Sequence, residues 1–384
     1  TDFDRVQVVE ADGERSYGSL IELDRYRRTI ALVRISNTDV YVVDIFRTKG
    51  GKVHDYMLHS CLEEAHGVEL SVPVDEPHHE ILHKYIRDVK RADVDGPWTA
   101  TFDLDEEDVG LKTFVLPQEG TQILSGEAPA MRREGTAPFI AVRQSDGESV
   151  FAVVHHPFSG APIVQDVEMV PLDGSDEGAV AIRVVLPDRV DTIISTADDD
   201  SRQLRRTSGG RISMQGRFAH VAEVDGDVRW VYLSDGDLLR IGEIEIAGET
   251  AHTGVLRSTR RIEAGDEVDA FITDAALPAD GSLDHHKLMV DEGGLLIQSF
   301  GIQAVENRDG ATWILSQDEP GMTVSPGLIK QEYFPNWGIS GEARFKIAGA
   351  ALLEREPTGE WSFRRTGQGK AVVGRKEIQR TVKH

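Results

Sequence analysis

Three side chains that can perform acid–base or metal chemistry lie close together at residues 54–59. His54, Tyr56 and His59 are the densest such group in any strand-like segment of the sequence. A histidine can ligate a metal or move a proton near neutral pH, and a tyrosine can act as an acid or a base. Side chains alternate along a strand, so His54 and Tyr56 should share one face and Asp55 and His59 the other. A bulge would be needed to bring both histidines together, and a polar strand at a sheet rim is the alternative.

The segment that positions this group reads as two strands joined by a turn. Residues 41–46 are apolar and β-branched, and Gly50 and Gly51 follow, which reach positive φ at little steric cost. The sequence therefore predicts a hairpin over residues 41–60, and this hairpin is the first place to look for a site.

Other histidines are weaker candidates. His79 and His83 lie in residues 77–90, whose apolar spacing predicts a short helix, and histidines at i and i+4 can share a metal. No third ligand is evident nearby, so a solvated helix face is the preferred interpretation. In the pairs His155–His156 and His285–His286, neighbours on a strand point to opposite faces, so at most one of each pair can join a site.

Most of the chain consists of short segments in which apolar and polar residues alternate. Val, Ile, Phe, Tyr, Trp and Thr fill these segments, and Gly, Asp, Asn and Pro separate them, which is typical of antiparallel β-structure. Asp-Gly between such segments predicts hairpin turns, for example at Asp225–Gly226, Asp235–Gly236 and Asp309–Gly310. Because helices are scarce, we predict an all-β protein built of packed antiparallel sheets, that is, β-sandwiches.

The length of 384 residues is enough for two or three domains. The pattern changes after Leu239, so we place a boundary near residue 243. Residues 1–242 are predicted to form a large antiparallel β-sandwich, and residues 243–384 a smaller C-terminal β-sandwich domain.

Composition limits the class of partner. The chain has 66 acidic and 42 basic residues and a formal charge of −24, the opposite of a nucleic-acid-binding protein, so no nucleic-acid partner is expected. No apolar run approaches the roughly 18 residues of a membrane helix, so we expect no membrane span. Cys61 is the single cysteine, which excludes an intrachain disulfide. The chain starts without methionine or a signal-peptide pattern, and we expect it to be a processed form or an excerpt.

Motifs for nucleotide binding are missing from the sequence, as is the GxSxG motif of many serine hydrolases. The arginine-rich segments 87–91, 202–211 and 257–261 could meet an anionic polymer or could be solvated surface. The aromatic segment YFPNWG at 333–338 could stack on sugar rings or close a core, and both interpretations stay open.

Three stretches, in the order YRRTIALV, YVVDIFRTKGGKVHDYMLH and SVFAVVHHPFSG, resemble the β-sheet part of heparinase II/III-like polysaccharide lyases. Two later stretches, RVVLPDRVDTIISTAD and PNWGISGEARFKIAG, also resemble this family, so the resemblance covers most of the chain. It implies an N-terminal α/α toroid followed by antiparallel sheet domains. This chain resembles only the second half, and a toroid is expected upstream.

The resemblance implies β-elimination on an acidic, uronate-containing polysaccharide. Such an enzyme neutralises the uronate carboxylate, removes the C5 proton with a base and assists departure of the glycosidic oxygen with an acid. In the family a tyrosine and one histidine of this machinery lie on the toroid. The chain is therefore expected to lack part of the catalytic machinery and to show little or no activity alone.

From these arguments we predict Tyr56 and His59 as catalytic residues. Family members hold a metal in the sheet domain through histidine and aspartate, so His54 is predicted to ligate one structural zinc or calcium ion, with His59 second. Three residues are predicted to bind substrate: Arg47, Tyr333 and Trp337. The expected partner is an acidic polysaccharide, and the expected location is extracellular or periplasmic. The alternative is a non-catalytic carbohydrate-binding or scaffold module.

Overall fold

The computed structural model describes residues 3–14, 23–59, 65–78, 84–104, 108–116, 118–129, 135–145, 147–173, 178–197, 203–248, 251–333, 338–367 and 369–381. These residues form mainly antiparallel sheets, and a short 3₁₀-helix, η2 (Ile262–Ala264), lies among them. The predicted all-β, sandwich-type fold is confirmed. Within the described residues, no helix is long and apolar enough to cross a membrane.

The chain divides into two compact units. The N-terminal unit consists of Phe3–Asp199 and His220–Val228, and the C-terminal unit consists of Asp200–Ala219 and Arg229–His384 with Thr1–Asp2. Strands β18 (Ile212–Val224) and β19 (Asp227–Ile241) have residues in both units. The boundary near residue 243 remains a prediction. Residues 229–241 of β19 group with the strands that follow because they pair with β20 and β30.

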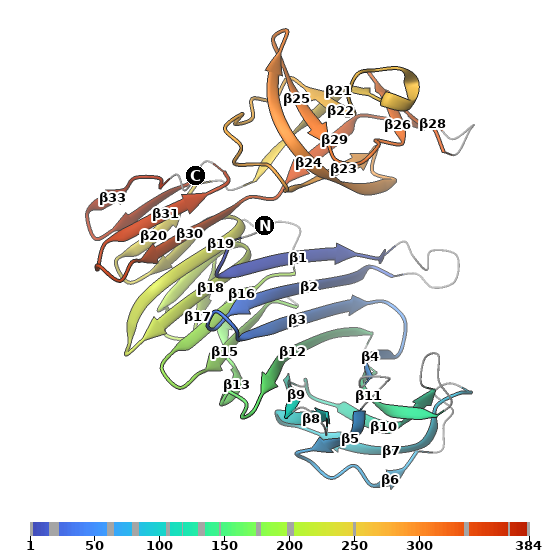
Figure 1. Cartoon of the computed structure of the whole chain (residues 1–384). Helices are drawn as coiled ribbons and strands as arrows, with labels where there is room; N and C mark the ends of the chain where they lie inside the picture. Colours follow the sequence, from blue (N-terminus) through green and yellow to red (C-terminus); the bar gives the residue numbers. More distant parts are fainter. Residues whose placement is uncertain are drawn as a thin grey trace. The chain divides into compact units, whose positions relative to one another are not determined.

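The N-terminal unit is built around one long antiparallel sheet, here called the first sheet. Its strand order is β1 (Val6–Asp12), β2 (Arg25–Arg34), β3 (Val40–Lys49), β12 (Glu148–Ser159), β9 (Val109–Leu116), β8 (Trp98–Leu104) and β5 (Ala65–Leu70). Figure 1 shows β3 and β12 near one another although they are far apart in sequence, and Val153 pairs with Asp44 across them.

A second sheet packs on one face of the first. Its order is β4 (His54–His59), β11 (Thr136–Gln144), β10 (Thr121–Pro129), β7 (Arg87–Val94) and β6 (Glu76–Pro77). Apolar side chains of the two sheets form one core, which includes Phe46, Trp98, Phe151, Ile140 and Val142. Because side chains alternate along each strand, every second side chain of the first sheet lies on its opposite face, where it can contact other strands.

That opposite face contacts a third group of antiparallel strands, β13 (Asp166–Met169), β15 (Val180–Val185) and β16 (Val190–Ser195). The contacts are polar as well as apolar, since Tyr41 bonds to Asp191 and Arg47 bonds to Ser195. Strand β14 (Leu172–Asp173) also belongs to this unit.

The hairpin predicted over residues 41–60 is wrong. Strand β3 lies between β2 and β12 in the first sheet, so both of its edges are occupied, and β4 pairs with β11 in the second sheet. The turn instead carries the chain from one sheet to the other. Gly50 and Gly51 have φ of 100° and 80°, which a residue with a Cβ adopts only with strain, so the glycines fit the turn as predicted.

The helix predicted over residues 77–90 is also wrong where the structure describes it. Arg87–Val94 forms β7, and Pro77 lies in β6, which pairs with β7. Strand pairing with β10 therefore outweighs the helical spacing of the apolar residues. His79 and His83 lie outside the described residues.

Two of the three Asp-Gly predictions named above are confirmed. Asp225–Gly226 and Asp309–Gly310 have positive φ at both positions and join consecutive strands. Asp235–Gly236 instead lies inside β19. A Cβ on Gly236 would come 2.7 Å from the Cα of Gly216, so this glycine permits a close approach of two strands rather than a turn.

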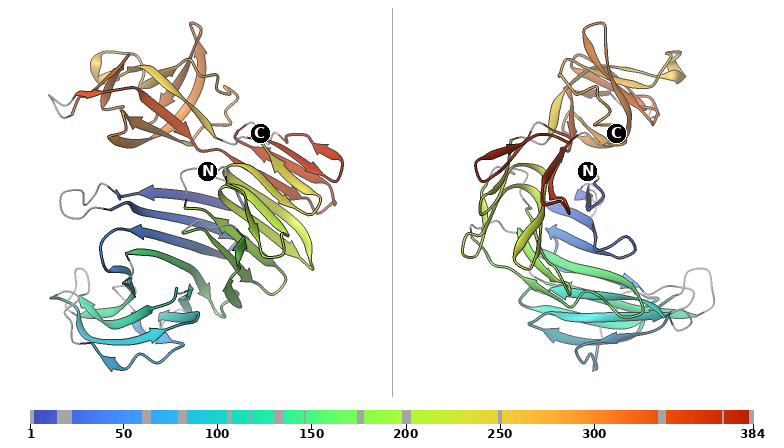
Figure 2. Two further views of the ribbon diagram at one scale, coloured as in Figure 1. Left: turned by 180° about the vertical axis from the view of Figure 1, so that it is seen from behind. Right: turned by 60° about the vertical axis from the view of Figure 1, so that its left-hand side comes forward.

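The C-terminal unit contains a closed barrel of antiparallel strands. Its order is β21 (His252–Arg260), β22 (Ala270–Thr273), β25 (Ala311–Ser316), β24 (Leu296–Arg308), β23 (Lys287–Glu292) and β29 (Ala343–Ile347). Register shifts at Leu256/Ser258 and Ile302/Ala304 bend two of these strands, which helps the sheet to close. Figure 2 shows these strands, coloured gold to red, in two views.

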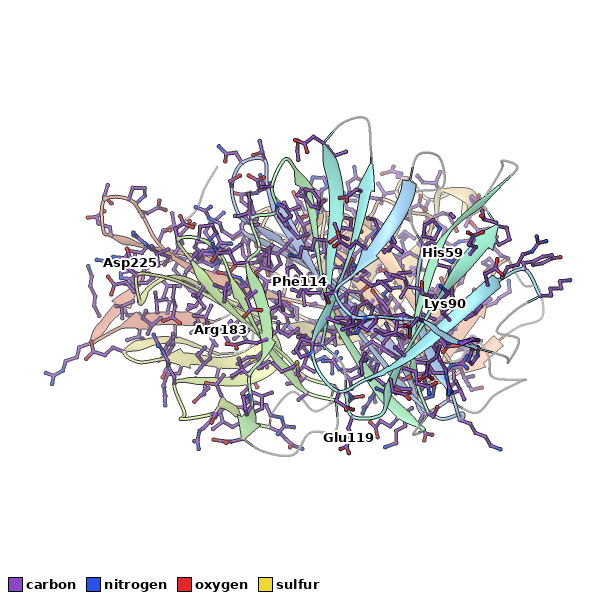
Figure 3. The ribbon with its side chains drawn as sticks, turned by 90° about the horizontal axis from the view of Figure 1, so that it is seen from below. His59, Lys90, Phe114, Glu119, Arg183 and Asp225 are labelled. Atoms are coloured by element: carbon purple, nitrogen blue, oxygen red, sulfur yellow. The ribbon has the colours of Figure 1, made fainter. Side chains whose placement is uncertain are left out.

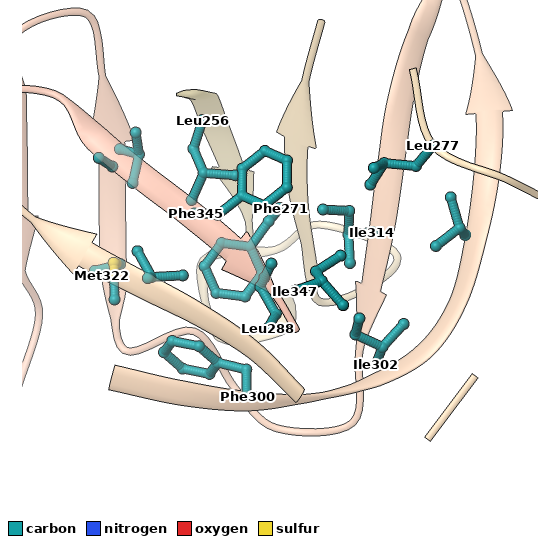
Figure 4. Packing of buried hydrophobic residues seen from close by; sticks show 14 of the residues in the cluster. Leu256, Phe271, Leu277, Leu288, Phe300, Ile302, Ile314, Met322, Phe345 and Ile347 are labelled. Carbon is teal, nitrogen blue, oxygen red and sulfur yellow. The ribbon is translucent and has the colours of Figure 1, made fainter. Parts of the chain in front are cut away.

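Apolar side chains fill the barrel (Figure 4). The ring centroids of Phe271 and Phe300, two residues of this core, lie 4.8 Å apart. The remaining strands of the unit are β17 (Arg205–Thr207), β20 (Ile244–Ala247), β26 (Met322–Ser325), β27 (Leu328–Gln331), β28 (Gly338–Ser340), β30 (Ala350–Arg355), β31 (Trp361–Arg365), β32 (Lys370–Val373) and β33 (Lys376–Ile378).

Candidate functional site

Five polar side chains of the N-terminal unit meet at one carboxylate and are called here the Asp44 network: Arg28, Asp44, Tyr56, Thr113 and His155. The strand registers explain why four of them share one face of the first sheet. Arg28 pairs with Phe46, Asp44 with Val153, and His155 with Thr113, so all point toward the second sheet. Tyr56 reaches them from β4 of the second sheet.

The Asp44 carboxylate is the centre of the network. Arg28 donates from Nε to Oδ1 at 2.9 Å and from Nη2 to Oδ2, which is a bidentate pair. The Tyr56 hydroxyl donates to Oδ2 at 2.7 Å. The carboxylate side chain is only 4% exposed, whereas the Arg28 side chain is 46% exposed, so solvent reaches the network through the guanidinium.

The directions of the remaining hydrogen bonds follow from this arrangement. Since the Tyr56 hydroxyl donates to Asp44, its oxygen accepts from Nε2 of His155 at 3.0 Å. Nδ1 of His155 then accepts from the Thr113 hydroxyl at 3.0 Å. In this tautomer the donors run from Thr113 through His155 and Tyr56 to Asp44.

The charges of the network reinforce one another. Burial alone would raise the pKa of Asp44, but the hydrogen bonds from Arg28 and Tyr56 and the nearby imidazole of His155 outweigh it and lower the pKa to about 2. The hydrogen bond to Asp44 raises the pKa of Arg28. Burial, and then the charge of Asp44, raise the pKa of Tyr56 well above its ordinary value. Asp44 is thus a fixed anion, and Tyr56 keeps its proton.

Asp44→Asn is expected to lower the free energy of unfolding at pH 7 by about 2–3 kcal/mol, the linkage expected when a carboxyl pKa falls from about 4 to about 2 on folding. A lowered pKa stabilises the fold above the unfolded pKa, and this stability is lost as pH falls through the folded value. The difference between wild type and variant should therefore shrink between pH 5 and about pH 2.

Urea unfolding at a series of pH values measures this difference. Asp95→Asn changes an exposed aspartate and is the matched control. If the difference in free energy of unfolding between wild type and Asp44→Asn does not change with pH, folding does not lower the pKa of Asp44, and the prediction is wrong.

The predicted catalytic residues Tyr56 and His59 are not brought together. Tyr56 is 2% exposed, and its ring stacks on Phe151 at 5.8 Å. His59 is exposed on the opposite face of β4, against the ring of Phe139 at 5.2 Å. The register of β4 with β11 runs without a shift from His54 to His59, so no bulge turns the two toward each other. Figure 3 labels His59 and Lys90, both of the second sheet.

His54, the predicted metal ligand, has both ring nitrogens engaged. Nε2 lies 2.5 Å from the carbonyl oxygen of Gly50 and must donate to it, so Nδ1 accepts from the Ser149 hydroxyl at 2.7 Å. A metal needs a free lone pair on one nitrogen. In this conformation His54 instead ties the Gly50–Gly51 turn to β12, and the predicted metal role does not fit.

Arg47, predicted to bind substrate, is 0% exposed. It donates to the carbonyl oxygen of Gly178 at 2.7 Å and to the Ser195 hydroxyl at 2.9 Å. A polymer cannot reach this guanidinium in the folded chain, because it fastens the first sheet to β16. The substrate-binding prediction for Arg47 does not fit the structure.

Of the two aromatic residues predicted to bind substrate, Tyr333 is 60% exposed. Its hydroxyl donates to Oε2 of Glu319 at 2.7 Å, and this bond raises the pKa of Tyr333 to about 12. The ring is therefore accessible and held in place. Trp337 lies outside the described residues.

Sequence reasoning missed Asp44 and Arg28 and gave His155 little weight. A usable signal was present, because Asp44 stands alone in the apolar run YVVDIF, and an aspartate at an inward position is almost never buried unless it is paired. His155 could not be connected to Tyr56 from the sequence, since the two are 99 residues apart.

A second polar cluster lies on the opposite face of the first sheet. Asp191 accepts from the Tyr41 hydroxyl at 2.7 Å and from Nη2 of Arg189 at 2.9 Å, and His220 Nε2 lies 3.4 Å away. Asp191 and His220 are both 0% exposed. Because the carboxylate and the imidazole are fully buried, we assign this cluster to stability rather than to a site.

Metal-ligating residues do not gather elsewhere. In the part of the chain that the structure describes, no group of three or more His, Cys, Asp or Glu side chains is arranged to hold a metal ion. Within that part, the Asp44 network is the best candidate for a site, because it joins titratable groups of several strands to an accessible cation.

The fold and the Asp44 network together define an all-β protein of antiparallel sheets with a partly exposed, arginine-capped polar site. No protein-family model and no curated protein matches the chain.

Proposed function

We propose that this chain is the β-sheet portion of a polysaccharide lyase that cleaves acidic, uronate-containing polysaccharide by β-elimination. In this proposal an α/α toroid supplies the catalytic tyrosine and a histidine, and the sheet portion holds the polymer and the toroid in place. The enzyme would act in the periplasm or outside the cell.

One observation carries the proposal. The three stretches that resemble heparinase II/III-like lyases each contribute to the Asp44 network, although they are far apart in sequence. Arg28 comes from YRRTIALV, Asp44 and Tyr56 from YVVDIFRTKGGKVHDYMLH, and His155 from SVFAVVHHPFSG. Stretches chosen by resemblance alone therefore meet at one site, which is expected if they belong to one functional unit.

Arg28 is the residue of this network that a uronate can reach. Its side chain is 46% exposed, and among the described residues Nη1 makes no hydrogen bond, while Nε and Nη2 are held by Asp44. Arginine pairs well with carboxylate. We therefore assign substrate contact to Arg28 rather than to the buried Arg47.

The same geometry supports a lack of turnover by the chain alone. The Tyr56 hydroxyl uses its proton on Asp44 and its oxygen on His155, and His59 lies on the opposite face. Neither residue is placed to move a substrate proton in concert with the other.

We expect the purified chain to bind acidic polymers without cleaving them. Absorbance of unsaturated uronate products should stay at background with alginate or heparin, and electrophoresis through gels containing these polymers should show salt-sensitive retardation. Arg28→Ala should weaken the retardation several-fold, and Arg183→Ala, which changes an exposed arginine of β15, should leave it unchanged.

Robust turnover by the chain alone would overturn the proposal that a toroid supplies catalytic residues and that the sheets only bind the polymer. Retardation that is equal for Arg28→Ala and wild type would overturn the assignment of substrate contact.

Tyr333 favours a second candidate, a non-catalytic carbohydrate-binding module. Its exposed ring, fixed by the bond to Glu319, offers a flat face on which a sugar ring can stack. The same gels distinguish the two candidates. If Tyr333→Ala abolishes retardation by both neutral and acidic glycans, and Arg28→Ala has no effect, the result favours the carbohydrate-binding module over the lyase.

A further inference from the structure

We propose that the guanidinium of Arg28 takes the place of a divalent cation at Asp44, so that this network carries its own cation and needs no metal ion. The resemblance implies a metal held in the sheet domain by histidine and aspartate. The described residues do not fit such a metal, and the reason lies in how the donors of the Asp44 network are used.

Two donors of the network have the spacing of metal ligands. Oδ2 of Asp44 and Nε2 of His155 lie 3.7 Å apart. Two ligands of one tetrahedral zinc ion, each about 2.0–2.1 Å from the metal, lie roughly 3.4 Å apart. The carboxylate and the imidazole thus approach each other as they would around a shared ion, and both are largely buried, with side chains 4% and 15% exposed.

Arg28 already neutralises this pair of donors. Its Nε bonds to Oδ1 and its Nη2 to Oδ2, so both carboxylate oxygens face the guanidinium. The side chain lies over the Tyr56 ring, with Cζ 5.4 Å from the ring centroid, which fixes the orientation of the fork. A guanidinium stays charged at any pH the fold survives, so the cation cannot be lost.

His155 is likewise not available to a metal. Its Nε2 proton points to the Tyr56 oxygen and its Nδ1 lone pair to the Thr113 hydroxyl. A metal at Asp44 would have to displace Arg28, remove the Nε2 proton and break the bond from Tyr56. The other predicted ligand, His54, is engaged through both nitrogens.

Metal content and thermal unfolding of the unmodified chain give the first test. Zinc or calcium is added, and the excess is removed by dialysis. Wild type should then retain no more metal than the control His59→Ala, which lacks an exposed histidine outside the network. EDTA should leave the Tm of wild type unchanged. Retention of about one equivalent that is lost in Asp44→Asn or His155→Ala would overturn the proposal.

An exchange of one residue gives the second test. Arg28→His replaces the guanidinium by a third metal-type donor beside Asp44 and His155, and this variant should bind about one equivalent of zinc and gain Tm when zinc is added. Adding His155→Ala to Arg28→His should abolish the uptake. Arg34→His, which adds a histidine at the far end of β2, is the matched control.

Uptake by Arg28→His no greater than by Arg34→His would overturn the proposal, because the remaining donors would then not be those of a cation site. If Arg28→His does not fold, the measurements on wild type still decide the question. None of these readouts depends on turnover or on polymer binding, so this inference and the lyase proposal can fail independently.

Discussion

Replacing Arg47 by alanine is expected to lower the free energy of unfolding by about 3–5 kcal/mol, which is a large share of the stability of a typical domain. The side chain is fully buried and donates to Thr29 on β2, to Gly178 and to Ser195 on β16. Its loss removes a cation that joins two layers and leaves several buried acceptors without their donor.

The size of this effect distinguishes the structural role of Arg47 from the substrate-binding role that the sequence predicted. A substrate-binding arginine is replaced at little cost to the fold, whereas a buried one is not. Arg47→Lys should also destabilise, because an ammonium cannot reproduce the several directions in which the guanidinium donates.

Urea unfolding followed by circular dichroism measures the effect, with Arg183→Ala as control. Arg183 pairs with Glu168 on the surface, with side chains 43% and 48% exposed, and its replacement should cost at most about 1 kcal/mol. A loss for Arg47→Ala as small as that of the control would contradict the structural role.

Asp191→Ala is expected to destabilise the protein by a similar amount, about 3–5 kcal/mol at neutral pH. Asp191 is fully buried and accepts from Tyr41 and Arg189 through the same oxygen, Oδ2, near which His220 also lies. Its removal takes the negative charge from a buried group of cations and donors. Asp191→Asn keeps the shape of the side chain and separates the loss of charge from the loss of packing.

The effect of Asp191 should depend on pH. Burial would raise the pKa of this carboxyl, but the charges and hydrogen bonds of His220 and Arg189 outweigh burial, and the pKa lies below its ordinary value near 4. The stabilisation is therefore present above about pH 4 and is lost as pH falls through the folded pKa.

Thermal and urea unfolding from pH 7 down to about pH 3 measure both parts of this prediction. The neighbouring exposed Asp188 provides the control, since Asp188→Ala should change stability by less than about 0.5 kcal/mol. A deficit of Asp191→Ala that grows as the pH falls would show that the carboxylate is not the stabilising form.

The sequence predicted which side chains of the candidate site share a strand face, but not which strands lie opposite that face. Alternation along residues 54–59 correctly put His54 and Tyr56 on one face and His59 on the other, because that depends only on backbone geometry. The same alternation could not say that the face of Tyr56 is closed by Phe151 and Asp44, since these belong to a different sheet.

Local features of this protein could be predicted from its sequence: the alternating strands, the all-β class and the glycines of the turn at Gly50–Gly51. Each depends on side-chain type and on neighbours along the chain. Three features follow instead from contacts between distant segments. Strands β3 and β4 belong to different sheets, Arg47 is buried, and one network joins Arg28, Asp44, Tyr56 and His155. Pairing between distant strands sets these results, and a pattern of period two shows which side of a strand faces inward but not which strand lies beside it.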